Sequence, residues 1–208
     1  GDEILTGNLL PVVREHVGRL GPGGTIAYPM VGCWRSTSVY RADGSVWSRS
    51  WVCSMFTDHP QVEWAARPDG YEHHARFPGR TSRKWMMPVR PHDGGVIHLQ
   101  FASWRRLLAK HVWYRMMETV RWPGRWTPEQ LNATYDEALD ETRRETRPVP
   151  DEWWAPYRER GWLEHLHLDH EPWHEAECRR LYAEHGAAAF AGLDLKGLVG
   201  GLRRDRVF

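Results

Sequence analysis

Cysteine is scarce in this chain of 208 residues, and it follows no recognised spacing. The number of cysteines is odd, they are widely separated, and no CxxC pair is present. These features argue against a disulfide framework and against a zinc site. We expect the three cysteines to be reduced and partly buried. They are Cys33, Cys53 and Cys178.

The chain also lacks a long hydrophobic run and an excess of one charge. No apolar stretch approaches the roughly 20 residues that a membrane-spanning helix needs. The N-terminal residues Gly1 to Glu3 are acidic, where a secretory signal would be basic. The formal net charge is +1, so no overall field would recruit nucleic acid. We therefore expect a cytoplasmic protein with no membrane span and no nucleic-acid partner.

The residues that are present suit a folded protein. Apolar residues make up 41% and charged residues 26% of the chain, which is ordinary for a globular domain. The length allows one domain, or one compact unit with a helical extension. Lysine is nearly replaced by arginine, with 3 Lys against 25 Arg, and we interpret this bias as genomic composition, with little functional weight.

The first hundred residues predict a helix followed by strands. Residues 8–20 space their apolar groups as a helix does, and the glycine-rich segment after them ends it. Residues 25–31 are typical of a strand. Residues 38–41 and 46–52 alternate between apolar and polar side chains, which predicts two strands of a hairpin. Residues 57–95 show no sustained period and predict a long loop, which is usually functional in a compact domain.

The second half is predicted to be mostly helical. A short strand over residues 94–101 leads into a helix that Ser103 caps and that continues to about Val120. The segment Thr127 to Gln130 is a start signal for a second helix over 128–146. After an expected boundary at Arg147 to Pro150, shorter helices are predicted at 151–160, 172–185 and 187–193. The predicted fold class is α/β, with a sheet-containing part at 1–101 and a helical C-terminal region at 102–208.

One segment could place positive charge beside a negatively charged ligand. The basic stretch from Arg80 to Arg90 includes Arg83 and Lys84 and leads to a strand that ends in His98. Arginine and lysine are the usual partners of phosphate, and neutral histidine is a common metal ligand. The alternatives are a solvated loop for the arginines and, for His98, a core histidine bonded to a backbone carbonyl.

Several short motifs occur together in an order that resembles GT-A-type glycosyltransferases related to family 2, of the kind found in bacteria and phages. Gly1-Asp2-Glu3-Ile4-Leu5 resembles the end of the acidic motif of these enzymes. The segment Lys84 to Pro91 resembles their basic segment, and His98 resembles the histidine that ends the following strand. The tracts from His98 to Arg125 and from Pro172 to Glu177 are also similar to segments of such proteins.

The resemblance implies a function and a set of site residues. The fold would be the distal part of a GT-A sheet followed by a helical region, and the reaction would be sugar transfer from a nucleotide-sugar donor to an unknown hydroxyl acceptor. Asp2 and His98 would bind Mn²⁺ or Mg²⁺, and Lys84, with Arg83 beside it, would face the donor diphosphate. Glu72 is the candidate general base. Other loop carboxylates that remain possible bases are Asp58, Glu63 and Asp69.

The resemblance also implies that the nucleotide-binding half of such an enzyme precedes Gly1. We therefore interpret the chain as a C-terminal portion, which would be a fragment, a split gene product or an inactive remnant. On its own it is expected to bind nucleoside diphosphates no more tightly than about millimolar, or about 4 kcal/mol. The alternative function is a non-catalytic carbohydrate-binding or structural protein that keeps this scaffold.

A second pattern points to different chemistry. His165-Leu166-His167-Leu168-Asp169-His170 reproduces the HxHxDH motif of metallo-β-lactamase-fold hydrolases, which binds two metal ions. In such enzymes the motif lies early in the domain and needs further ligands over a long downstream stretch. Only 38 residues follow His170 here, with His174 and His185 as their histidines. We therefore expect a chance match that binds no metal.

Overall fold

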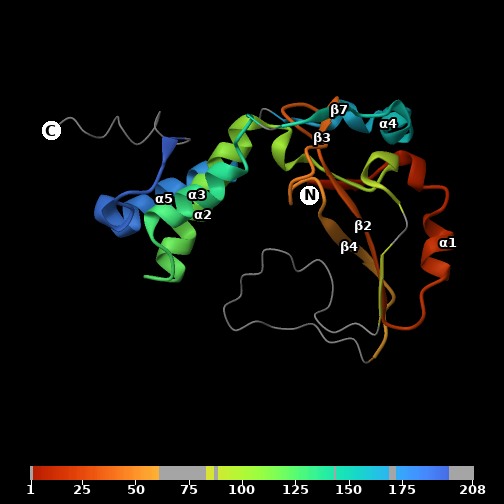
Figure 1. Cartoon of the computed structure of the whole chain (residues 1–208), viewed down its shortest axis with the longest axis horizontal. Helices are drawn as coiled ribbons and strands as arrows, with labels where there is room; N and C mark the ends of the chain where they lie inside the picture. The colour runs from red at the N-terminus through yellow and green to blue at the C-terminus, as the bar shows by residue number, and fades with distance from the viewer. Residues whose placement is uncertain (1, 61–82, 87–88, 143, 169–171, 197–208) are drawn as a thin grey trace. The chain divides into compact units, whose positions relative to one another are not determined.

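The structure is a computed structural model that describes residues 2–60, 83–86, 89–142, 144–168 and 172–196 (Figure 1). It is a mixed α/β protein, which confirms the predicted fold class at this general level. The strands are β1 (Glu3–Leu5), β2 (Gly24–Gly32), β3 (Val39–Arg41), β4 (Trp51–Phe56), β5 (Arg83–Met86), β6 (Val96–His98) and β7 (Thr146–Pro148). The helices are α1 (Val13–Gly18), α2 (Trp104–Arg121), α3 (Pro128–Glu137), α4 (Asp151–Arg158) and α5 (Trp173–Ala189), with short 3-10 helices η1 (Gly7–Leu9), η2 (Pro91–Asp93), η3 (Leu99–Phe101) and η4 (Trp162–His165).

The chain divides into two compact units. The sheet unit consists of residues 1–33, 37–99 and 145–166, and the helical unit consists of residues 34–36, 100–144 and 167–208. The change of unit after residue 99 lies close to the boundary expected after residue 101. Residues 145–166, which fall within the expected C-terminal region, belong to the sheet unit.

Strand β2 is the centre of the sheet unit. The main sheet has the order β1-β6-β2-β4, and β5 also pairs with β2. Figure 1 shows β2 and β4 running side by side. Eight of the nine residues of β2 are buried, which explains the apolar run that predicts this strand. Ile26 and Tyr28 of β2 form a core with Leu9, Val52 and Val96.

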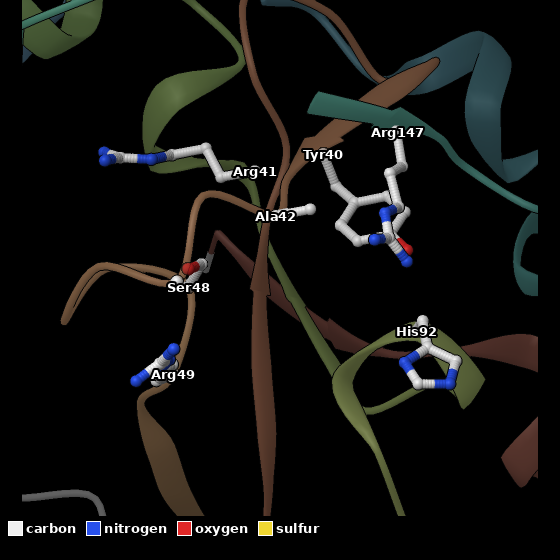
Figure 2. Close-up of a pocket in the computed structure, with 8 residues that line it drawn as sticks. Tyr40, Arg41, Ala42, Ser48, Arg49, His92 and Arg147 are labelled. Carbon is white, nitrogen blue, oxygen red and sulfur yellow. The ribbon is translucent and has the colours of Figure 1, made fainter. Parts of the chain in front are cut away.

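The predicted hairpin of residues 38–41 and 46–52 is wrong. Strand β3 pairs antiparallel with β7, so that Tyr40 lies opposite Arg147 (Figure 2), whereas β4 pairs with β2. Most of the segment expected as the second strand, residues 46–50, lies outside any strand, and β4 begins at Trp51.

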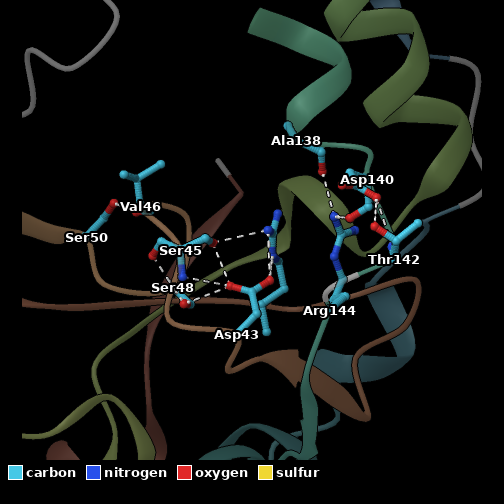
Figure 3. Close-up of polar contacts among 10 residues, drawn as sticks. Asp43, Ser45, Val46, Ser48, Ser50, Ala138, Asp140, Thr142 and Arg144 are labelled. Carbon is cyan, nitrogen blue, oxygen red and sulfur yellow. Dashed lines mark hydrogen bonds and ion pairs between the residues drawn. The ribbon is translucent and has the colours of Figure 1, made fainter. Parts of the chain in front are cut away.

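Hydrogen bonds of Asp43 explain this difference. Its Oδ1 accepts from the Ser45 backbone nitrogen at 3.0 Å, from Ser45 Oγ at 2.6 Å and from Ser48 Oγ at 3.0 Å (Figure 3). Its Oδ2 accepts from Arg41 Nε at 3.1 Å and Nη2 at 2.9 Å. An aspartate that bonds nearby backbone and hydroxyl groups stabilises a turn, which competes with strand formation.

The helical unit is organised by α2 and α5. Ser103 accepts a hydrogen bond from the backbone nitrogen of Arg106, which confirms the predicted cap of α2. The core consists of Val112 and Met116 of α2, Cys178 and Leu181 of α5, and Phe190 after α5. His111 and Arg115 are also buried, and Arg115 Nη2 donates to Asp136 Oδ1 at 2.6 Å.

The second predicted helix starts as expected and ends early. Thr127 and Gln130 form the predicted capping box of α3. The helix ends at Glu137 instead of residue 146, since Asp140 Oδ1 accepts from the backbone nitrogen and hydroxyl of Thr142 and holds a turn there (Figure 3). The expected boundary segment beyond it forms β7 in part.

Two expectations from composition concern the cysteines and the membrane. All three cysteines are buried free thiols, and burial raises the pKa of Cys33 and of Cys178 to about 12. Within the described part of the chain, no helix is both long enough and apolar enough to cross a bilayer.

Candidate metal centre

The pairing of β1 with β6 brings together residues that lie far apart in the sequence. The strands are antiparallel, with Glu3 opposite His98, and the backbone nitrogen of Leu99 donates to the Asp2 carbonyl at 2.8 Å. Residues directly opposite each other in an antiparallel pair have side chains on the same face. The register therefore places His98 beside the acidic N-terminal residues.

Close backbone packing at Gly95 sets the position of β6. The Thr6 backbone nitrogen donates to the Gly95 carbonyl at 2.8 Å, and the Gly95 nitrogen donates to Thr6 Oγ1 at 3.0 Å. A Cβ at residue 95 would lie 2.1 Å from the Pro29 carbonyl oxygen. Only glycine allows β6 to approach β2 this closely, because it has no Cβ.

Asp2, Glu3 and His98 form a cluster of three groups that can bind metal. His98 Nε2 lies 3.5 Å from Asp2 Oδ2 and 3.9 Å from Glu3 Oε1. One ligand atom from each residue lies within 4.8 Å of the other two. The His98 side chain is 8% exposed, and the two carboxylates are 22% and 23% exposed. The imidazole is thus held in the protein while the carboxylates reach solvent.

The spacing and chemistry of the cluster fit a divalent cation. Metal–ligand distances of about 2.0 to 2.6 Å place two ligands of one ion at most about 4 to 5 Å apart, and the cluster meets this limit. Carboxylates suit Mg²⁺ and Mn²⁺, and an imidazole suits transition metals better than Mg²⁺. The set therefore favours Mn²⁺ over Mg²⁺. It is the one group of this kind among the residues that the structure describes.

A pocket of about 290 Å³ adjoins Glu3 of the cluster. Glu3 lines the pocket and also belongs to the cluster, whereas Asp2 and His98 do not line the pocket. Ser54 is the one hydroxyl side chain in its wall, which is otherwise mostly apolar. The remaining lining residues are Ile4, Leu5, Cys53, Met55 and Val96.

The basic residues predicted to face a diphosphate belong to β5, which pairs with a different part of β2 than β6 does. Lys84 is opposite Thr25, whereas His98 is opposite Gly32, seven residues further along the strand. That offset is roughly 23 Å at 3.3 Å per residue. The side chains of Arg83 and Lys84 are outside what the structure describes. Their role as diphosphate ligands stays a prediction from the resemblance, and the strand register does not bring the Lys84 backbone to the cluster.

The other predicted residues fall partly outside the described chain. Glu72, the candidate base, lies outside it, as do Glu63 and Asp69. Asp58 is described and exposed, two residues after β4. In the HxHxDH segment, Asp169 and His170 are outside the described residues, so the expectation that the segment binds no metal stays a prediction.

Comparisons of the chain with protein-family models, with curated proteins and with solved structures found no match. The structure brings Asp2 and His98 together, as expected from the order of the motifs. It adds Glu3, which sequence reasoning noted in the acidic motif without assigning it to the metal. The missing signal is the strand register, because only the register shows that residue 3 is opposite His98.

Proposed function

We propose that this chain is the metal-binding portion of a GT-A-type glycosyltransferase that transfers a sugar from a nucleotide-sugar donor to a hydroxyl acceptor. One observation carries the proposal. Asp2 and His98 are far apart in the sequence, yet their side chains lie within reach of one ion. The resemblance predicts this pair from motif order alone, so the geometry supports it independently.

The cluster suits the charge that develops in such a reaction. The leaving group is a nucleoside diphosphate, whose negative charge increases as the sugar departs. A Mn²⁺ or Mg²⁺ ion held by Asp2, Glu3 and His98 would stabilise that charge. The buried His98 ring is oriented by the packing of β6, and the apolar walls of the pocket beside Glu3 would exclude water from the sugar.

The acceptor hydroxyl must also lose a proton, which requires a general base. We propose Glu72 for this role on the resemblance alone. The pocket beside Glu3 is the proposed position of the transferred sugar, because Glu3 of the cluster lines it.

A titration with Mn²⁺, followed by the electron paramagnetic resonance signal of the free ion, tests the metal centre. Asp2→Asn and His98→Gln should each weaken Mn²⁺ binding at least about tenfold, since each removes a ligand. The matched control is His185→Gln, because His185 Nε2 lies 3.6 Å from Glu184 Oε1 in another histidine–carboxylate pair. Equal Mn²⁺ affinity in the two cluster variants and the control would refute the metal centre.

Calorimetric titration with UDP and GDP tests the step from metal binding to donor binding. We expect weak diphosphate binding that requires Mn²⁺ and is lost in His98→Gln. Mn²⁺ binding that leaves diphosphate affinity unchanged would refute sugar transfer and would favour the non-catalytic alternative.

A further inference from the structure

A second pocket of about 230 Å³ lies in the sheet unit, beside the pairing of β3 with β7 (Figure 2). None of its lining residues belongs to the metal cluster. We call it the β3–β7 pocket. It is lined by Tyr40, Arg41, Ala42, Gly44, Ser48, Arg49, His92 and Arg147.

Strand alternation determines which side chains enter this pocket. Tyr40 and Arg41 are adjacent in β3, so their side chains point to opposite sides, as Figure 2 shows. The Arg41 side chain is buried, and its charge is neutralised by Asp43. The Tyr40 ring lies beside the Arg147 guanidinium in Figure 2. The small side chain of Ala42 leaves space between the walls.

Two arginines and one histidine reach the pocket from three separate segments. His92 comes from η2, Arg147 from β7 and Arg49 from the turn after β3. An atom at the Cβ position of Gly44 would lie 3.0 Å from Arg49 Nη2, so the Arg49 guanidinium rests against the Gly44 backbone. Figure 2 places Arg49 across Ala42 from Arg147 and His92.

The carboxylates near the pocket neutralise the charges of the two arginines only in part. Arg49 forms no ion pair with any residue that the structure describes. Arg147 pairs with Glu145 at 3.1 Å, but both side chains are more than half exposed, and such pairs are weak. His92 lies 3.5 Å from Asp93, again on the surface. An incoming dianion can therefore displace the Glu145 contact and bind Arg147.

We propose that the β3–β7 pocket binds the phosphate group of a small phosphorylated molecule, at a site separate from the metal cluster. The Arg147 guanidinium would donate to two phosphate oxygens, and the Tyr40 hydroxyl would donate to one of them. Arg49 would balance the second negative charge of the phosphate. The volume is below the roughly 300 to 1,000 Å³ of pockets for drug-sized ligands, which favours a ligand no larger than a sugar phosphate. This proposal does not depend on sugar transfer.

Calorimetric titration of the chain with glucose 6-phosphate, in the presence of EDTA, tests the proposal. EDTA removes any contribution from the metal cluster, and glucose is the uncharged comparison ligand. We expect binding of glucose 6-phosphate that weakens as salt is added and no binding of glucose. Absence of binding up to about 10 mM, or equal binding of glucose, would overturn the proposal.

Variants identify the binding residues. Arg147→Gln and Arg49→Gln should each weaken binding about tenfold or more, the effect expected for loss of a charged hydrogen-bond donor. Arg147→Lys should recover only part of the affinity, because lysine cannot form the bidentate contact. Arg158→Gln is the control, since Arg158 is an exposed arginine paired with Asp151 on α4. Losses no larger than that of the control would show that the ligand binds elsewhere.

Discussion

Replacing Asp43 with asparagine tests how the turn after β3 is stabilised. The side chains of Asp43 and Arg41 are 7% and 3% exposed, so this is a buried ion pair. Burial by itself raises the pKa of Asp43, but hydrogen bonds from Ser45 and Arg41 outweigh it and lower the pKa from 3.8 to about 2. At about 1.4 kcal/mol per pKa unit, the ionised carboxylate contributes about 2 kcal/mol to the free energy of unfolding.

Asp43→Asn should lower the free energy of unfolding by somewhat more than this contribution. The asparagine amide would remove the acceptor of two Arg41 donors and leave a buried guanidinium without its counter-charge. Breaking one side of a buried pair typically costs about 3 to 5 kcal/mol. We expect a loss of about 3 kcal/mol at pH 6, measured by urea denaturation. Asp151→Asn is the control, because Asp151 is 92% exposed in its pair with Arg158, and it should change stability by less than about 1 kcal/mol.

The pH dependence gives a second test of the same reasoning. The folded-state pKa of Asp43 lies below its unfolded value, so the stabilisation is fully present above about pH 4 and is lost as the pH falls toward 2. At pH 3 the difference in the free energy of unfolding between wild type and Asp43→Asn should be about 1 kcal/mol smaller than at pH 6. A loss below about 1 kcal/mol at pH 6, or the same loss at both pH values, would refute the argument.

Two further predictions concern one buried position in each unit, Gly95 in the sheet unit and His111 in the helical unit. Gly95→Ala should destabilise the chain by at least about 3 kcal/mol in thermal or urea denaturation and weaken Mn²⁺ binding, because its Cβ would clash with the Pro29 carbonyl. Gly18→Ala, where no atom lies within 4 Å of the added Cβ, should be neutral or stabilising, and equal effects of the two would contradict this account. Burial, followed by the charges of Arg115 and Lys110, lowers the pKa of His111 to about 3, so its contribution to stability is present above pH 6.5 and is lost as the pH falls toward 3. Between pH 7 and pH 5 the free energy of unfolding of the wild type should fall by about 2 kcal/mol, and that of His111→Leu should not show this fall. Identical pH profiles of the two proteins in urea denaturation would show that His111 does not titrate in this way.

Local signals in the sequence predict local structure well. The caps at Ser103 and Thr127 were predictable because a capping hydrogen bond joins residues only three positions apart. Strand β2 was predictable because a strand buried on both faces is apolar along its length. The ends of elements were less predictable, since Asp43 and Asp140 stop a strand and a helix through side-chain hydrogen bonds that compete with regular structure.

Long-range pairing could not be predicted in the same way. Tyr40 and Arg147 lie opposite each other in β3 and β7, but nothing in either strand specifies the other as its partner. The β3–β7 pocket depends on this pairing, so the sequence alone did not reveal it. The closeness of Asp2 and His98 was predictable only through the order of motifs in a resembling family, and the addition of Glu3 required the register of β1 and β6.

The return of residues 145–166 to the sheet unit affects how this chain can fold during synthesis. Strand β3 pairs with β7, and the Trp154 indole nitrogen donates to the Thr37 carbonyl at 2.9 Å. These contacts join residues more than 100 positions apart, and such non-local contacts slow folding because a long loop must close before they form. A ribosome-bound chain that ends before residue 146 therefore lacks the partner strand of β3. Until that strand emerges, the edge of β3 that pairs with β7 is unpaired, and Tyr40 lacks its contact with β7. The nascent chain is therefore prone to aggregation over this interval.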